Sequence, residues 1–424
     1  MESMESVVHH QSDSFNFLLP PIQVPHTHTA RMELQNTSPL ARSVLAIPEL
    51  LDHTMNYLSE SPEDFHSCAL VSKSWVPHAQ SYLFREITLV PPNDMNIFGR
   101  LMKSLETSPH LAHLIRHLSI SLNIQLLEYV TGMVLPRLEE LSVHCTDAQY
   151  SHRRDISTKH LVQSLLRLPT IRRVTLDGIF NSISVIHAYF DNCSRCLQSL
   201  VLSELYVESS PDGSPPDPST LATVPAKIQL SHLTLPLDFS VLDVWITGLR
   251  CPFGLSSLQS IYIPVDKWRS FRGALTPSFH SIEYLKLGDF YDNADLDLSG
   301  LTALQSLDVE LDQRYDFPGI LTALERLPAG SNGLHTLILH IHSVSAKDEK
   351  AFREFDAAIT TLATMRSLRR VEIHIASRQL DLRPKLDIDT LPSCFPSLSS
   401  NGRLFVYPPP PPEIIYVSDA EEEG

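Results

Sequence analysis

One short pattern of apolar and variable positions recurs along most of the chain. Each copy holds an apolar residue, two variable residues, a second apolar residue, one variable residue and a final apolar residue. The copies begin at residues 84, 115, 138, 171, 197, 230, 258, 282, 304, 334 and 368. Because successive side chains of a strand point to opposite faces, the alternation that closes each copy predicts a short strand.

Between the copies, apolar residues often recur at helical spacing. Such stripes cover residues 97–105, 161–168 and 239–249, and each predicts a helix with one buried face. Ser345 and Asp348 form a capping-box pattern ahead of a fourth stripe at 352–362, which we expect to be the longest helix of the chain. Strands that alternate with helices are predicted to be parallel, because a parallel pair needs a crossover connection of about a dozen residues.

The spacing of the copies resembles that of leucine-rich repeats. Successive copies begin 22 to 34 residues apart, with a mean of about 28, near the upper edge of the range of roughly 20 to 29 for such repeats. The resemblance implies an α/β fold in which residues 84–407 stack as an irregular, curved solenoid with its strands on the concave side. The asparagine that usually follows the strand of these repeats is matched once, at Asn123. The alternative is an ordinary α/β domain, although eleven consecutive strands in one open sheet would be unusual.

A first short helix is predicted well ahead of the first copy. Pro48 suits the first turn of a helix, where the missing N–H costs nothing. The residues that follow at helical spacing form one apolar stripe, made of Leu50, Leu51, Thr54, Met55 and Leu58.

Two more helices are predicted between this one and the first copy. The second begins at Pro62, with Ser61 as its cap and Asp64 returning the hydrogen bond, and runs towards Trp75. A third short helix covers residues 77–83. These roughly forty residues bury too little surface to stabilise three helices by themselves. We therefore expect the remaining apolar groups of the helices to face another domain or another protein.

The segments IPELLDHTMNYL (47–58) and DFHSCALVSKSW (64–75) resemble the two halves of an F-box. That motif opens on Leu-Pro-x-Glu-Leu/Ile, continues through an apolar helix and an Asp-Leu step, and closes on Leu-Val-Cys/Ser-Arg/Lys-x-Trp. The matching residues are Pro48, Glu49, Leu50, Leu51, Leu58, Asp64, Leu70, Val71, Ser72, Lys73 and Trp75. Ile47 and Phe65 stand where leucine is commoner. The continuation LFREITL is similar to the F-box-like proteins that are abundant in mushroom-forming fungi.

This resemblance implies that residues 41–90 bind a Skp-family adaptor and, through it, a cullin–RING ubiquitin ligase. The residues that would contact the adaptor or support the contact are Pro48, Leu50, Leu51, Leu58, Leu70, Val71 and Trp75. The chain would then be a non-catalytic substrate receptor of an SCF-type ligase, with its repeats binding an unknown target protein. Two alternatives stay open: a non-degradative scaffold with a vestigial F-box, and an enzyme with a site on the strands.

Charge and composition narrow the class of partner and the compartment. The 33 Lys and Arg residues against 49 Asp and Glu give a net charge of −16 without a basic cluster, so we expect no nucleic-acid partner. No apolar run approaches the roughly 18 residues that a membrane helix needs, and the first residues lack the features of a signal peptide. Six scattered cysteines do not form a disulfide framework in so long a chain, which favours the cytoplasm or the nucleus.

The remaining segments are predicted from their composition. Residues 1–40 are rich in Ser, His, Thr and Pro and are expected to be a disordered arm. Turn-forming residues at 207–226 predict a long exposed loop. After a terminal strand at 404–407 and a cap for the last repeat, residues 408–424 form a proline-rich and acidic tail that we expect to be disordered.

Motifs with a known catalytic mechanism, such as the P-loop and the G-x-S-x-G elbow, are absent from the sequence. Cys193 and Cys196 form a C-x-x-C pair that lacks a second pair of ligands. His340, His342 and His374 alternate with apolar residues, as solvated residues of a strand face do. We therefore expect no cofactor and no metal, although residues distant in the sequence can assemble a hydrolytic site that no motif reveals.

Overall fold

The computed structural model describes residues 47–58, 62–90, 94–145, 152–180, 182–207, 227–236, 240–248, 251–290, 296–311, 317–328, 333–341, 349–362, 365–375 and 388–408. The predicted arm at 1–40, residues 208–226 of the predicted loop and residues 409–424 of the tail lie outside the described residues, as do Ser61, His342, Ser345 and Asp348. The chain divides into two compact units, Met1–Cys196 and Leu197–Gly424.

The first described part of unit 1 is a small helical module of α2 (Pro48–Tyr57), α3 (Pro62–Val71) and α4 (Val76–Leu83). These helices confirm the three that the sequence predicts. They share a core of their own, formed by Leu51, Met55, Phe65, Cys68 and Ala79. The prediction that the second helix runs towards Trp75 is wrong by one turn, because α3 ends at Val71. A turn follows, in which the Trp75 N–H donates a hydrogen bond to the Ser72 carbonyl at 3.0 Å.

All eleven copies of the apolar pattern form strands, and each strand begins at the third residue of its copy. In unit 1 these are β1 (Glu86–Leu89), β2 (His117–Ser121), β3 (Glu140–Cys145) and β4 (Arg173–Phe180). In unit 2 they are β5 (Ser199–Val207), β7 (His232–Thr234), β9 (Ser260–Pro264), β10 (Tyr284–Phe290), β11 (Ser306–Leu311), β12 (Thr336–Ile341) and β13 (Arg370–Ile375). The predicted terminal strand is confirmed as β14 (Leu404–Tyr407).

A recurring hydrogen-bond arrangement fixes where the strands begin. The carbonyl of the second residue of one copy accepts the N–H groups of the second and third residues of the next copy. Arg85 O thus accepts from Arg116 N and His117 N, both at 2.9 Å. The same arrangement recurs at the carbonyls of Arg116, Glu139, Gln198, Ser231, Gln259, Glu283, Gln305 and His335. The parallel ladder therefore starts at an equivalent point in each of these copies.

These strands belong to one twelve-stranded sheet with the order β1-β2-β3-β4-β5-β7-β9-β10-β11-β12-β13-β14. Every described pair is parallel, and equivalent residues of the copies face one another, as Leu307, Leu337 and Val371 do. This confirms the predicted parallel α/β arrangement. A separate two-stranded sheet of β6 (Ile228–Gln229) and β8 (Phe253–Gly254), also parallel, was not predicted.

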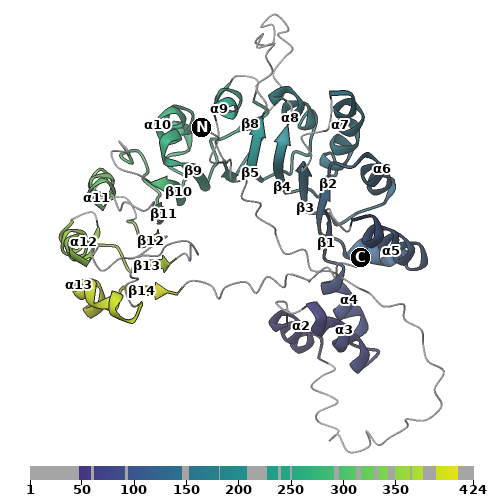
Figure 1. Cartoon of the computed structure of the whole chain (residues 1–424), viewed down its shortest axis with the longest axis horizontal. Helices are drawn as coiled ribbons and strands as arrows, with labels where there is room; N and C mark the ends of the chain where they lie inside the picture. Colours follow the sequence, from purple (N-terminus) through teal and green to yellow (C-terminus); the bar gives the residue numbers. More distant parts are fainter. Residues whose placement is uncertain are drawn as a thin grey trace, which may run out of the picture. The chain divides into compact units, whose positions relative to one another are not determined.

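Helices lie on one side of the strands within each unit (Figure 1). Unit 1 has α5 (Asp94–Thr107), η1 (Pro109–Leu114), α6 (Ile124–Gly132), α7 (His152–Leu166) and α8 (Ile183–Tyr189). Unit 2 has α9 (Ser240–Thr247), α10 (Val265–Leu275), η2 (Thr276–Ser278), α11 (Phe317–Glu325), α12 (Glu349–Thr361), η5 (Ile388–Cys394) and α13 (Pro396–Ser400). Among the described helices α7 is the longest at 15 residues, so the expectation that α12, at 13, would be the longest is wrong.

The core lies between the strands and the helices. In ten of the copies all three apolar positions are buried, whereas in the first copy Phe84 and Ile87 are only half-buried. Burial alternates along strands such as β3 and β12, which leaves their other face partly open to solvent. A doubly wound sheet would instead be covered by helices on both faces. Asn123, which matches the asparagine that follows the strand in leucine-rich repeats, caps α6 by accepting hydrogen bonds from two backbone N–H groups.

Candidate partner-binding surfaces

Helix α2 carries apolar residues on two sides. Leu51 and Met55 point into the module core and are 4% and 0% exposed, while Leu50 is 45% and Tyr57 85% exposed. The single apolar stripe predicted from the sequence is therefore wrong in part: Leu51 faces the module core, whereas Leu50, about 100° away around the helix, faces outward. With Ile47, Leu50 and Tyr57 follow a spacing of three and seven residues that places all three on the outer side.

Helix α3 adds two exposed apolar residues at its C-terminal end. Leu70 is 87% and Val71 63% exposed, although Phe65 and Cys68 of the same helix are buried. We call Ile47, Leu50, Tyr57, Leu70 and Val71 the exposed apolar set. Nine large apolar residues are exposed in the described part of the chain, and five of them form this set. Large exposed apolar side chains that gather in one small module are candidates for contact with a partner.

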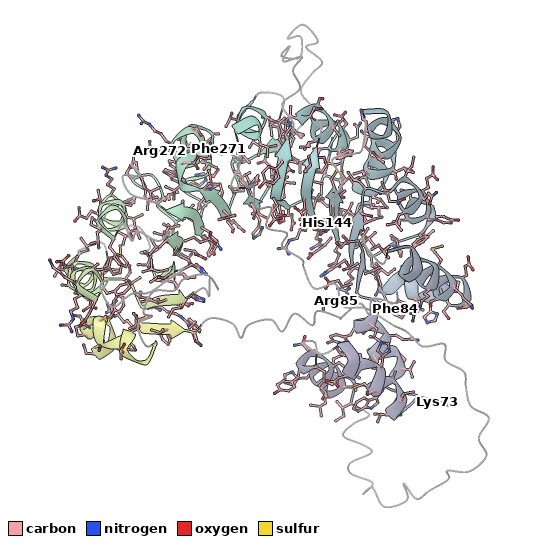
Figure 2. The ribbon with its side chains drawn as sticks, viewed as in Figure 1. Lys73, Phe84, Arg85, His144, Phe271 and Arg272 are labelled. Carbon is pink, nitrogen blue, oxygen red and sulfur yellow. The ribbon has the colours of Figure 1, made fainter. Side chains whose placement is uncertain are left out.

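Contacts within the module hold the two helices that carry this set. Asp52 of α2 binds α4 twice, through the His78 Nδ1 at 2.7 Å and through its backbone carbonyl, which accepts from the Tyr82 hydroxyl at 3.2 Å. Tyr82 also stacks on Phe65 of α3, with ring centroids 5.1 Å apart. Lys73, in the turn that follows α3, lies on the surface of the module (Figure 2). The apolar residues left outside are thus carried by a packed scaffold.

The seven residues predicted to serve adaptor binding occupy different environments. Leu50, Leu70 and Val71 are exposed, which suits direct contact. Leu51 is buried in the module core, and Leu58 and Trp75 are half-buried and pack against it. Pro48 is the first residue of α2, and its side chain lies outside the described part. Sequence reasoning missed Tyr57, which its position seven residues after Leu50 would have placed on the outer side.

A second surface lies on the open face of strands β9–β14 in unit 2. Its residues occupy the variable positions next to the apolar pair of each copy. Their side chains form ion pairs and hydrogen bonds between different strands. Lys286 Nζ lies 2.6 Å from Glu310 Oε1 and 5.2 Å from the ring centroid of Tyr262. The Tyr262 hydroxyl donates to Glu310 at 3.5 Å.

Asp308 is the most buried charge of this surface, at 4% exposed. It accepts a hydrogen bond from the Tyr284 hydroxyl at 2.7 Å, and His340 Nε2 lies 3.1 Å from its other oxygen. Burial opposes its ionisation, but the hydrogen bonds from His340 and Tyr284 outweigh burial and hold the pKa of Asp308 below its usual range. Burial and the bond to Asp308 raise the pKa of Tyr284. Asp308 therefore stays ionised at neutral pH.

Rings from three adjacent strands stack beside Asp308. His340 and His374 have centroids 4.9 Å apart, and Tyr407 stacks on His374 at 4.5 Å. Glu372 accepts from His374 at 2.9 Å, and the Arg370 guanidinium lies over the ring of Phe405. The expectation that His340 and His374 lie on a strand face is confirmed, but both are half-buried and paired with carboxylates instead of solvated. We call Tyr262, Tyr284, Lys286, Asp308, Glu310, His340, Arg370, Glu372, His374, Phe405 and Tyr407 the charged and aromatic face.

The cysteines do not form a reactive pair. Cys193 is buried, and burial raises its pKa to about 12, while Cys196 is exposed and both thiols are free. No group of three or more His, Cys, Asp and Glu side chains that could hold a metal occurs among the residues that the structure describes. No helix in this part of the chain is both long enough and apolar enough to span a membrane.

Comparison with known proteins gives little. No protein-family model matches the sequence, and no curated protein matches it significantly. One similar solved structure is titled "Crystal structure of Rad7 and Elc1 complex in yeast", with a TM-score of 0.28 and 15% sequence identity over 83% of this chain and 97% of that chain. A similarity with this TM-score carries no argument about fold or function.

Proposed function

We propose that the chain is the substrate receptor of an SCF-type cullin–RING ubiquitin ligase. The observation that carries the proposal is the exposed apolar set, which lies on a helical module whose sequence resembles an F-box. Complete burial of a leucine side chain contributes about 1.5–3 kcal/mol, so two or three members of the set supply much of a micromolar affinity, about 8 kcal/mol. The partner of this set is a Skp-family adaptor, which links the chain to the cullin.

In this proposal the repeats form a leucine-rich-repeat-like solenoid that binds the target protein. The charged and aromatic face is our candidate for the contact, because it presents rings and both signs of charge on the side of the strands that the helices leave open. Aromatic and arginine side chains are enriched among the residues that dominate protein interfaces.

The chain would perform no step of ubiquitin transfer in this role. It would hold a target near a ubiquitin-charged enzyme recruited elsewhere in the assembly, so its contribution is proximity. The acidic net charge of −16 agrees with a protein partner better than with nucleic acid. We place this activity in the cytoplasm or the nucleus.

The test is a binding titration of the purified full chain with a purified Skp-family adaptor. Leu70→Asp places a charge where the adaptor would bury an apolar side chain, so the affinity should fall at least tenfold, as expected for a loss of 1.5 kcal/mol or more. Val134→Asp is the matched control, because Val134 is 76% exposed but lies outside the module. Equal binding by both variants would refute the proposed interface. Adaptor binding without accumulation of any target in cells that lack the chain would favour the scaffold.

A further inference from the structure

Three polar side chains on adjacent strands of unit 1 form a connected chain of hydrogen bonds. Ser119 Oγ of β2 lies 2.8 Å from His144 Nε2 of β3, and His144 Nδ1 lies 3.0 Å from Asp177 Oδ2 of β4. Figure 2 shows His144 on the side of the strands away from the helices. The strand register places His144 directly opposite Asp177. The order hydroxyl, imidazole, carboxylate, joined through these atoms, is that of a hydrolase triad.

The chemistry of the three groups fixes the direction of the hydrogen bonds. An ionised carboxylate only accepts, so Asp177 receives the proton carried by His144 Nδ1. The neutral imidazole then has an unprotonated Nε2, which can only accept, so the Ser119 hydroxyl donates to it. His144 is therefore set as a general base towards Ser119, with Asp177 fixing its tautomer and orientation.

The side chains around the triad are small at the level of Ser119 and charged two residues earlier, where Glu140 pairs with His117 and Arg173. The residues aligned with Ser119 on the neighbouring strands are Thr88, Ser142 and Thr175, which are all small. The side chains of His144 and Asp177 are 24% and 28% exposed, so the site is open to solvent.

A further hydroxyl lies on the same strand face, two residues after Ser119. Ser121 is 4% exposed, is aligned with His144, and its hydroxyl has no hydrogen-bond partner among the described residues. A buried hydroxyl without a partner is uncommon.

We propose that Ser119 is a catalytic nucleophile that hydrolyses short-chain carboxylic esters. Its oxygen attacks the ester carbonyl carbon while its proton passes to His144 Nε2. The bond to the leaving alcohol then breaks, and the alcohol takes that proton, which leaves the acyl group on Ser119. Water, deprotonated by His144, attacks the acyl carbonyl and releases the carboxylic acid, and His144 returns the proton to Ser119. The Ser121 hydroxyl is the candidate donor to the oxyanion.

The residues aligned with Ser119 are small, so an ester with a short acyl chain can approach its hydroxyl. This activity goes beyond the receptor function and does not rest on it. The two proposals can therefore fail separately.

The test measures hydrolysis of p-nitrophenyl acetate by the full chain and covalent labelling by a fluorophosphonate, followed by mass spectrometry of the labelled peptide. We expect the adduct on Ser119, and a loss of at least about a hundredfold in rate for Ser119→Ala and for Asp177→Asn, which replaces the carboxylate beside the His144 Nδ1 with a neutral amide that no longer fixes the imidazole tautomer. Ser142→Ala is the control that should retain the rate, because Ser142 aligns with Ser119 but takes no part in the triad.

If the hydrogen bonds among Ser119, His144 and Asp177 only stabilise the strands, labelling and hydrolysis will not depend on Ser119. An adduct on another serine, no adduct in the wild-type chain, or unchanged hydrolysis by Ser119→Ala would overturn the proposal. Circular dichroism and the urea midpoint of each variant report folding. The labelling of the wild-type chain decides the question even where a variant misfolds.

Discussion

The last helix of unit 2 depends on a carboxylate from another helix. Asp356 of α12 is 1% exposed and accepts hydrogen bonds from the backbone N–H groups of Ser397 at 2.8 Å and Leu398 at 2.9 Å. These groups belong to the first turn of α13, whose own preceding residue, Phe395, makes no side-chain cap. Asp356 therefore caps α13 from a distance and holds the final helix of the described chain against α12.

Asp356→Ala removes both acceptors at once. A hydrogen bond to a charged group contributes about 1.5–3 kcal/mol. We take the lower value for each bond because the substitution also removes the cost of burying a charge, so the expected loss is about 3 kcal/mol. That corresponds to roughly a hundredfold increase in the opening equilibrium of this region. Asp356→Asn keeps one acceptor oxygen and should lose an intermediate amount.

Hydrogen exchange of peptides covering residues 388–407 measures this opening directly. Exchange in Asp356→Ala should be about a hundredfold faster than in the wild type. Glu354→Ala is the control on the same helix, because its side chain is 68% exposed and its ion pair with Lys350 is a surface contact. Equal exchange in Asp356→Ala and Glu354→Ala would refute the capping role.

Two further predictions concern titrating groups. The pKa of Asp308 is depressed in the folded chain, so its ionised form stabilises the fold above the unfolded pKa of about 3.9, and this contribution is lost as the pH falls through the folded pKa. Asp308→Asn should therefore lower the urea midpoint at pH 7, and the difference from the wild-type midpoint should shrink below about pH 4. A difference that does not change with pH would contradict the assignment. Iodoacetamide at pH 7.5 should modify Cys196 and leave Cys193 unmodified, because burial raises the pKa of Cys193 to about 12; peptide mass spectrometry checks this, and equal labelling would contradict it.

Much of the fold could be predicted because each copy of the repeat is defined by residues that lie close together in the sequence. Three apolar residues at fixed spacing define each copy, and in nine copies the carbonyl that starts the ladder belongs to the second residue, as at Arg85 and Gln305. Each strand therefore begins at the third residue of its copy. The β6–β8 pair follows no repeat of this kind, and only its tertiary contacts place it.

The candidate sites were harder to predict because their residues meet across strands. Ser119 and His144 are 25 residues apart, and His144 and Asp177 are 33 apart. Since the spacing between copies varies, only the register shows that these side chains meet. The exposed apolar set was predicted in part, since Leu50, Leu70 and Val71 match the F-box pattern while Tyr57 does not.

The central claim is that the helical module binds the adaptor through its exposed apolar set. Hydrogen exchange of the full chain, with and without a saturating Skp-family adaptor, tests it most directly. The account predicts slower exchange in residues 47–58 and 62–71 when the adaptor is present, and unchanged exchange in the strands β9–β13. Protection that is absent from both segments, or that appears only in those strands, would contradict it.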